Sequence, residues 1–240
     1  MSEDGASSDD EDWENASKAL GNLISQLSVS VSPTKKLLIL LDMNGTLLLR
    51  SKVKLPKRAH EYKILGNFCY FRKSAREFCQ WLATVPDVDL CFYTSMKEES
   101  ARPLSVQLIG DESVFLFDQT YNKRDSDGEH TWSMMRDLER LWQTDGTPAS
   151  GHTERDTLMI DDSFAKMRQH PDNVFIVKEY TEEYITSGFD VNDDTLERTK
   201  DFLQVLLQRW QRNAHTEADA DIRPHVVALR REFSSASPER

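Results

Sequence analysis

Carboxylate, amide and hydroxyl side chains follow three short apolar runs of this sequence, in each case directly after the run ends. They are Asp42 and Asn44 after residues 37–41, Thr94 and Ser95 after 88–93, and Asp161 and Asp162 after 157–160. If the runs are neighbouring parallel strands, their carboxyl ends meet at one edge of a sheet, where ligands bind. Three carboxylates brought together repel one another unless a cation joins them. Mg²⁺ fits such a cluster best, because it binds few carboxylates and keeps positions open for phosphate oxygens.

Each of these signals is weak when it is taken alone. The sequence DMNG at 42–45 is also an ordinary turn sequence, in which Gly45 supplies a positive φ. Asp161 and Asp162 could simply cap a helix. Their order along the chain and their shared place after apolar runs make the combination strong.

The pattern of apolar residues predicts the elements that hold these side chains. A short, continuous apolar run such as 37–41 is typical of a strand buried on both faces of a parallel sheet. We expect further strands at 88–93, 114–117, 157–160 and 174–177, and helices at 74–83, 98–109, 134–142 and about 196–210. Residues 117–130 are polar and irregular, as in an insertion. Strands that alternate with helices predict an α/β fold, a mostly parallel sheet with helices on both faces.

Acidic residues are concentrated at the N-terminal end of the chain. The net charge is −11, but seven acidic residues and no basic one lie within residues 1–14. We expect residues 1–35 to form an acidic disordered tail and an amphipathic helix, with Trp13, Leu20 and Leu27 on its apolar stripe. That stripe packs on the domain or, as the less expected option, docks a partner protein. Residues 36–211 form the α/β domain, and 212–240 a loosely ordered tail with at most a short helix at 226–233.

Composition excludes several classes of function. The acidic balance argues against direct nucleic-acid binding, and the longest unbroken apolar run, 37–41, is far too short to cross a membrane. The acidic N-terminus does not resemble a signal or transit peptide. Three cysteines without metal-type spacing indicate reduced thiols, as in a nuclear or cytoplasmic protein.

Three motifs resemble those of haloacid-dehalogenase-type phosphatases: LLILLDMNGTLL, LCFYTSM and TLMIDDS, in this order. The flanking segments FRKSAREFCQWL, MRDLERLW and DDSFAKMRQHPDNVFIV are similar to the branch that dephosphorylates the RNA polymerase II C-terminal domain, the NLI-interacting-factor-like phosphatases. The resemblance covers roughly residues 36–211. It implies the haloacid-dehalogenase fold, a Rossmann-like sheet with a small insertion.

The resemblance also implies roles for single residues. Asp42 would be the nucleophile that forms an aspartyl-phosphate, and also a Mg²⁺ ligand. The backbone carbonyl of Asn44 and the carboxylate of Asp162 would complete the protein's share of the metal site. Asp161, in the same acidic cluster, would orient a basic residue.

Two further roles concern the phosphoryl group. Thr94, with Ser95 beside it, would donate a hydrogen bond to the transferring group. A lysine that neutralises its charge precedes the last motif in the family, and Arg136 aligns best with that lysine. Arginine can serve electrostatically, but its planar fork is not a compact ammonium.

Asn44 departs from the family pattern at a position that matters for catalysis. Active members have an aspartate there, which protonates the leaving alkoxide and then activates water. An amide forms hydrogen bonds but does not exchange protons at neutral pH. The loss of such a group typically lowers the rate by about 10²–10⁴. Metal binding survives, because this position ligates through its backbone carbonyl.

A run of basic residues follows the first motif. The stretch 50–63 contains a single acidic residue, Glu61, and six basic ones: Arg50, Lys52, Lys54, Lys57, Arg58 and Lys63. A solvated basic loop is the default interpretation. The alternative is that Lys54, Lys57 and Arg58 attract an acidic or multiply phosphorylated substrate.

Three hypotheses about function result. The first is a Mg²⁺-dependent phosphoprotein (Ser/Thr) phosphatase that works through Asp42 and is slowed by Asn44. The second is a catalytically inactive pseudo-phosphatase that binds a phosphorylated or acidic protein as a scaffold. The third, a small-metabolite phosphatase, is disfavoured because no large cap domain is evident. The intact Asp42, Thr94, Asp161 and Asp162 favour the first slightly over the second.

Overall fold

The computed structural model describes residues 35–56, 58–126, 134–214 and 220–235, all of which belong to one compact unit, 35–240. The predictions for the acidic tail and the amphipathic helix at 13–27 fall outside the described residues, as does Lys57.

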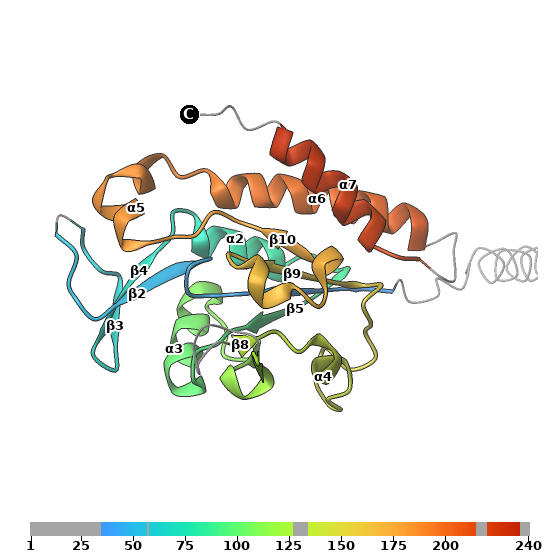
Figure 1. Ribbon diagram of the computed structural model, residues 1–240, viewed down its shortest axis with the longest axis horizontal. Helices are drawn as coiled ribbons and strands as arrows, with labels where there is room; N and C mark the ends of the chain where they lie inside the picture. The colour runs from blue at the N-terminus through green and yellow to red at the C-terminus, as the bar shows by residue number, and fades with distance from the viewer. Residues whose placement is uncertain (1–34, 57, 127–133, 215–219, 236–240) are drawn as a thin grey trace, which may run out of the picture. The chain divides into compact units, whose positions relative to one another are not determined.

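A five-stranded parallel sheet forms the centre of the described part of the chain (Figure 1). In spatial order its strands are β10 (Val174–Ile176), β9 (Thr157–Asp161), β1 (Leu37–Leu41), β5 (Val88–Tyr93) and β6 (Phe115–Phe117). β1 lies in the middle, and all five of its residues are buried. Leu41 at its end pairs with Phe92 of β5 and Ile160 of β9. The three strand ends predicted to converge are therefore neighbours.

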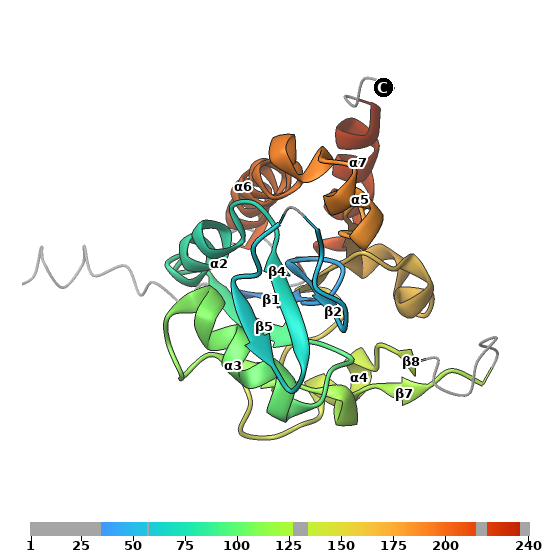
Figure 2. The ribbon, with the colours of Figure 1, turned by 90° about the vertical axis from the view of Figure 1, so that its left-hand side faces the viewer.

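Helices cover both faces of this sheet, which confirms the predicted α/β class. On the face of Leu37, Ile39 and Leu41 pack α2 (Ala75–Ala83), α3 (Glu98–Ile109), α6 (Thr195–Ala214) and α7 (Arg223–Ser235). On the face of Leu38 and Leu40 packs α4 (Leu138–Trp142). Figure 2 shows α2 and α6 on one side of the strands and α4 on the other. α5 (Glu182–Thr186) lies against a third, smaller apolar cluster.

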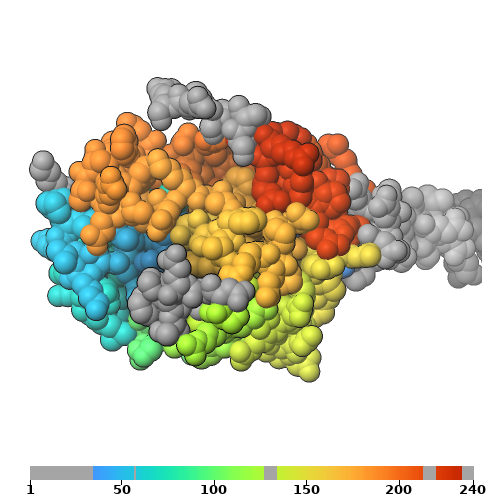
Figure 3. Space-filling model, in the orientation of Figure 1, coloured from blue at the N-terminus to red at the C-terminus, as the bar shows by residue number. Residues whose placement is uncertain are grey.

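Short 3₁₀ helices connect several elements: η1 (Gln119–Tyr121), η2 (Phe164–Met167), η3 (Pro171–Asn173) and η4 (Phe189–Asn192). On the face drawn in Figure 3, the segment with η2 and η3 lies between α7 and the segment around α4. Met167 at the end of η2 is 1 % exposed and packs in the cluster below the sheet that includes Leu38 and Leu40. The loop after the last motif is thus fixed to the core.

Two small antiparallel sheets flank the core. The first, in the order β2 (Leu48–Ser51), β4 (Asn67–Phe71), β3 (Tyr62–Ile64), was not expected from the sequence. The second pairs β7 (Lys123–Arg124) with β8 (Met134–Met135). The predicted helix at 134–142 is therefore wrong over its first turn. The helix begins only after Asp137, whose side chain caps it by accepting the N–H of Arg140 at 3.3 Å.

The C-terminal part corrects another prediction. Residues 223–235 form the regular helix α7 instead of a loose tail, because Ile222, Val226 and Leu229 are buried in the main core cluster. The preceding helix, α6, also reaches back to the start of the domain, since the indole N–H of Trp210 donates to the carbonyl of Lys35 at 2.8 Å. No helix among the described residues is both long and apolar enough to span a membrane.

Candidate active site

Asp42 lies at the carboxyl end of β1 and is 2 % exposed. Its backbone N–H donates to the carbonyl of Ile160 at 2.9 Å, which ties the strand end to β9. One carboxylate oxygen is 2.9 Å from Nη2 of Arg136 and the other is 3.3 Å from Nζ of Lys166. Burial alone would raise the pKa of Asp42, but the charges of Arg136 and Lys166 outweigh burial and lower it. Asp42 is therefore an ionised, desolvated carboxylate.

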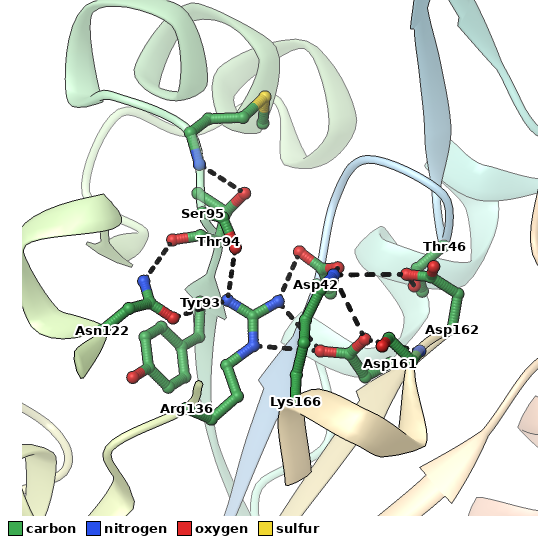
Figure 4. A network of polar contacts seen from close by, with 12 residues as sticks. Asp42, Thr46, Tyr93, Thr94, Ser95, Asn122, Arg136, Asp161, Asp162 and Lys166 are labelled. Atoms are coloured by element: carbon green, nitrogen blue, oxygen red, sulfur yellow. Dashed lines mark hydrogen bonds and ion pairs between the residues drawn. The ribbon is translucent and has the colours of Figure 1, made fainter. Parts of the chain in front are cut away.

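Arg136 is the buried cation at the centre of the network in Figure 4. Its Nε and Nη2 both donate to Oδ2 of Asp161, at 3.0 and 2.9 Å, and its Nη1 donates to Oδ1 of Asn122 at 3.0 Å. The guanidinium also lies over the ring of Tyr93, 4.8 Å from its centroid. Burial would lower the pKa of Arg136, but the charges of Asp42 and Asp161 raise it overall, so the side chain is always charged.

The backbone that carries Arg136 explains this placement. Arg136 lies between the end of β8 and the cap of α4, and its own N–H donates to the carbonyl of Lys166 at 3.0 Å. The structure thus brings Arg136, predicted as the charge-neutralising residue, next to the predicted nucleophile. Asn122, which orients Nη1 and also donates to the carbonyl of Thr94 at 2.9 Å, was not found from the sequence. Nothing in its local sequence distinguishes it from other polar loop residues.

Asp161 and Asp162 have different surroundings although they are adjacent. Oδ2 of Asp161 accepts from Arg136, and its Oδ1 accepts the N–H of Ser163 at 2.8 Å. Asp162 is partly exposed, and its Oδ1 accepts from the hydroxyl of Thr46 at 3.2 Å. Burial, together with the charges of Asp42 and Asp161, raises the pKa of Asp162 to about 7. A cation near Asp162 would therefore relieve charge that the protein only partly balances.

Gly45 allows the first and last motifs to meet. Its φ is +90°, a backbone conformation that residues with a side chain rarely adopt. A Cβ at this position would lie 2.8 Å from the carboxyl carbon of Asp162. The turn after Asp42 can approach the Asp162 carboxylate only because residue 45 is glycine.

Lys166 is a site residue that the sequence analysis missed. Its Nζ lies 3.3 Å from Asp42, 3.7 Å from Asp161 and 3.9 Å from Asp162, and its side chain is 26 % exposed. The family pattern indicates a basic residue before the last motif, where Arg136 lies, and Lys166 comes after that motif. The available signal was the spacing Asp162 to Lys166, four residues on in the same segment.

The hydroxyl groups of Thr94 and Ser95, which follow β5, lie on the side of Asp42 away from Asp162 (Figure 4). The Thr94 side chain is buried, and its oxygen accepts the N–H of Met96 at 3.2 Å, which leaves the hydroxyl proton free to donate. Ser95 is exposed, with its hydroxyl 3.5 Å from Nη1 of Arg136. Both residues line a cavity of about 470 Å³, together with Asp42, Asn44 and Lys166.

Asn44 holds the strand that follows the first motif. Its side-chain oxygen accepts the backbone N–H of Arg50 at 2.9 Å. Arg50 in turn lines the cavity, and its buried Nε has no hydrogen-bond partner among the described residues. Burial lowers the pKa of Arg50. The amide oxygen of Asn44 thus binds the backbone of Arg50, and residue 44 brings no ionisable group to the cavity.

Two other predicted substrate-binding residues, Lys54 and Arg58, are not part of the lining of this cavity. Arg58 binds Asp190 at 2.6 Å, Glu61 at 3.2 Å and the carbonyl of Phe71 at 3.2 Å, contacts that hold the chain together. Lys54 is exposed. Within the basic segment, Arg50 is the described residue that reaches the cavity lining.

The acidic cluster fits a small, hard cation. Asp42, Asp161 and Asp162 each offer a carboxylate oxygen, and these oxygens lie within 4.8 Å of one another. The donors are of the type that Mg²⁺ prefers. Both oxygens of Asp161 already accept hydrogen bonds from Arg136 and Ser163. Asp161 is also fully buried and does not line the cavity, whereas Asp42 lines it and Asp162 is partly exposed. Asp42 and Asp162 are therefore the better ligand candidates, and Asp161 orients the arginine.

Residues 37–213 match the family described as NLI interacting factor-like phosphatase. No curated protein sequence matches the chain.

Two solved structures are similar, with a TM-score of 0.42 each. "The Structure of Fcp1, an essential RNA polymerase II CTD phosphatase" is 14 % identical, and the match covers 89 % of this chain and 66 % of that chain. Fission yeast RNA polymerase II CTD phosphatase Fcp1-R271A bound to beryllium fluoride is 13 % identical, with the same coverage. The chain thus spans 66 % of the length of these structures. Because the family match covers well over half of its residues, this chain belongs to the NLI interacting factor-like phosphatases.

Proposed function

We propose that this chain is a Mg²⁺-dependent phosphoprotein phosphatase that acts through Asp42 and is slow because Asn44 replaces an acid. The observation that carries the proposal is the state of Asp42. It is an ionised carboxylate at a strand end, it faces a cavity of about 470 Å³, and it lies beside two cations. A purely structural carboxylate has no need of an adjacent cavity.

The residues around Asp42 suit phosphoryl transfer. A carboxylate oxygen of Asp42 attacks phosphorus, the bond from phosphorus to the substrate oxygen breaks, and water then hydrolyses the aspartyl-phosphate. Arg136 and Lys166 stabilise the negative charge of the transferring group, and the Thr94 hydroxyl donates a hydrogen bond to it. Asp42 and Asp162 would hold Mg²⁺, which supplies further charge neutralisation when it is bound.

Proton transfer is the weak step of this site. The leaving alkoxide of a phosphoserine needs a proton, and the amide of Asn44 has none to give at neutral pH. Asp125 is another acid along the cavity, but both of its carboxylate oxygens bind the guanidinium of Arg168. An aryl phosphate, whose phenolate leaves more readily, depends less on an acid.

The role of Asn44 favours a second function, that of a pseudo-phosphatase. The Asn44 side chain is engaged with the backbone N–H of Arg50, so this position supports structure in place of acid chemistry. In this alternative the cavity binds a phosphorylated partner without hydrolysing it.

The proposed substrate is a phosphorylated protein or acidic peptide in the nucleus or cytoplasm. Arg50 lines the cavity and gives it a positive charge that attracts acidic segments. Such attraction weakens with salt.

Hydrolysis by wild type, Asn44→Asp and Asp42→Asn variants, with and without Mg²⁺, tests the proposal. Asn44→Asp should raise turnover of a phosphoserine peptide by about 10²–10⁴, and less for an aryl phosphate. Asp42→Asn should be inactive on both substrates. Asn44 precedes Gly45, a pair that is prone to deamidation, so intact-mass analysis must accompany each assay.

The outcomes separate the two functions. Activity of intact wild type on an aryl phosphate, lost in Asp42→Asn, supports the phosphatase. If neither wild type nor Asn44→Asp hydrolyses either substrate, while both bind phosphate analogues, the chain is a pseudo-phosphatase.

A further inference from the structure

The ammonium group of Lys166 lies where the acidic cluster would bind a cation. It is within 4 Å of one oxygen from each of Asp42, Asp161 and Asp162, at 3.3, 3.7 and 3.9 Å. These are the same three carboxylates whose oxygens lie within 4.8 Å of one another. Figure 4 shows the Lys166 side chain running along the cluster toward Asp42. The acidic cluster therefore already has a cation supplied by the chain.

The backbone of Lys166 is fixed on both sides. Ser163, three residues earlier, donates its N–H to Asp161 at 2.8 Å, and Met167, the next residue, is buried in the core. The carbonyl of Lys166 itself accepts the N–H of Arg136 at 3.0 Å. With the backbone held, movement of the charge is limited to rotation of the four-carbon side chain.

Of the two cations that pair with Asp42 among the described residues, only Lys166 has room to move. Arg136 is fully buried and binds Asp161 through two nitrogens and Asn122 through a third. Lys166 is 26 % exposed and lines the cavity. A rotation of its side chain would carry the ammonium away from the carboxylates and toward whatever anion the cavity holds.

We propose that Lys166 is an internal competitor of Mg²⁺: its ammonium occupies the Asp42–Asp162 site, and Mg²⁺ binds only as the ammonium moves into the cavity. This inference rests on the proposed Mg²⁺ site. A phosphate group in the cavity attracts the displaced ammonium, so phosphate and Mg²⁺ strengthen each other's binding. By thermodynamic linkage the two effects are equal in free energy.

Calorimetric titration of the protein with Mg²⁺ tests the proposal without any activity measurement. Lys166→Met removes the competing charge and keeps much of the side-chain volume, and it should bind Mg²⁺ at least about tenfold more tightly than wild type. Lys166→Arg retains the charge and should bind Mg²⁺ no more tightly than wild type. Arg50→Met is the matched control: it removes a charge from the same cavity, but Arg50 forms no ion pair with the three carboxylates. Its effect should be well below that of Lys166→Met.

Inorganic phosphate provides the second arm of the titration. It should tighten Mg²⁺ binding to wild type, and this coupling should shrink in Lys166→Met. Equal or weaker Mg²⁺ binding by Lys166→Met, or an equal gain in Arg50→Met, overturns the proposal while the metal site itself stands. If no form binds Mg²⁺, the metal part of the proposed function fails and this inference fails with it.

A measurement on wild type guards against a variant that does not fold. Amine acetylation followed by peptide mass spectrometry reports how available each lysine is. Mg²⁺ should make Lys166 react faster by freeing its ammonium from the carboxylates, whereas the exposed Lys97 should be unaffected. Unchanged labelling of Lys166 at saturating Mg²⁺ would overturn the proposal.

Discussion

Replacement of Arg136 by methionine should be one of the most destabilising single changes in the domain. The arginine is 0 % exposed, and its removal leaves Asp161 and Asp42 without their nearest cation in a desolvated site. Breaking a buried ion pair by removing one partner costs about 3–5 kcal/mol. Lys166 remains 3.3 Å from Asp42 and 3.7 Å from Asp161 and offsets part of the loss.

We therefore expect Arg136→Met to lower the free energy of unfolding by about 3 kcal/mol, toward the lower end of that range. In a domain of this size the melting temperature should fall by about 6–12 °C. Urea denaturation in the presence of EDTA, at constant m-value, measures the change without a contribution from bound metal.

Two companion variants make the result specific to the buried pair. Arg140→Met removes an arginine whose side chain is exposed and should cost less than about 1 kcal/mol. Adding Asp161→Asn to Arg136→Met removes the stranded charge and should restore at least about half of the lost stability. A loss below about 1 kcal/mol in Arg136→Met, or no recovery in the double variant, would refute the reasoning.

Two further predictions concern the turn beside the site and the far end of the sheet. Gly45→Ala should cost at least about 2 kcal/mol in urea denaturation, because φ is +90° and the new Cβ would meet the Asp162 carboxylate at 2.8 Å; an alanine variant as stable as wild type would contradict the close approach. At His152, burial opposes the proton, but hydrogen bonds and charge from Asp156 and Asp89 raise the pKa above 6.5. Since the folded state holds the proton more tightly, this stabilisation is full below pH 6.5 and disappears as pH rises through the raised pKa. Unfolding free energies of wild type and His152→Gln measured across that window should differ most at the acid end, and parallel profiles would be the contrary result.

The sequence predicted the central sheet well because its strands are short, continuous apolar runs. Residues 37–41 and 88–93 match β1 and β5 at both ends: β1 is apolar and buried throughout, and β5 ends in three buried residues although it includes the half-buried Asp89 near its start. The strands of the small sheet were missed for the opposite reason. Residues 48–51 continue directly from the first motif, and 62–64 mix exposed and half-buried side chains, so neither has a clear period.

The site was predictable as far as strand ends determine it. Asp42, Thr94 and Asp161 each follow a predicted strand, and their convergence needs only the parallel order. Lys166 lies in the short 3₁₀ helix η2 and Asn122 directly follows η1, and their contact with the site depends on where these connections fold back, which no local pattern specifies. Helix periodicity misled at 134–135, where pairing with β7 prevails over helix propensity.

The middle position of β1 makes the site depend on long-range strand pairing. Asp42 and Lys166 are 124 residues apart in the chain, and they meet only when β9 pairs with β1. Pairings between such distant segments form slowly, because the entropy of closing the intervening loop must be overcome first. The β1–β5 pair by itself does not bring Arg136 or Lys166 beside the carboxylate, because both cations lie beyond β5 and also bind Asp161 at the end of β9. Assembly of this cluster therefore requires the pairing of β9 with β1, and any change that weakens this strand pair also weakens the site.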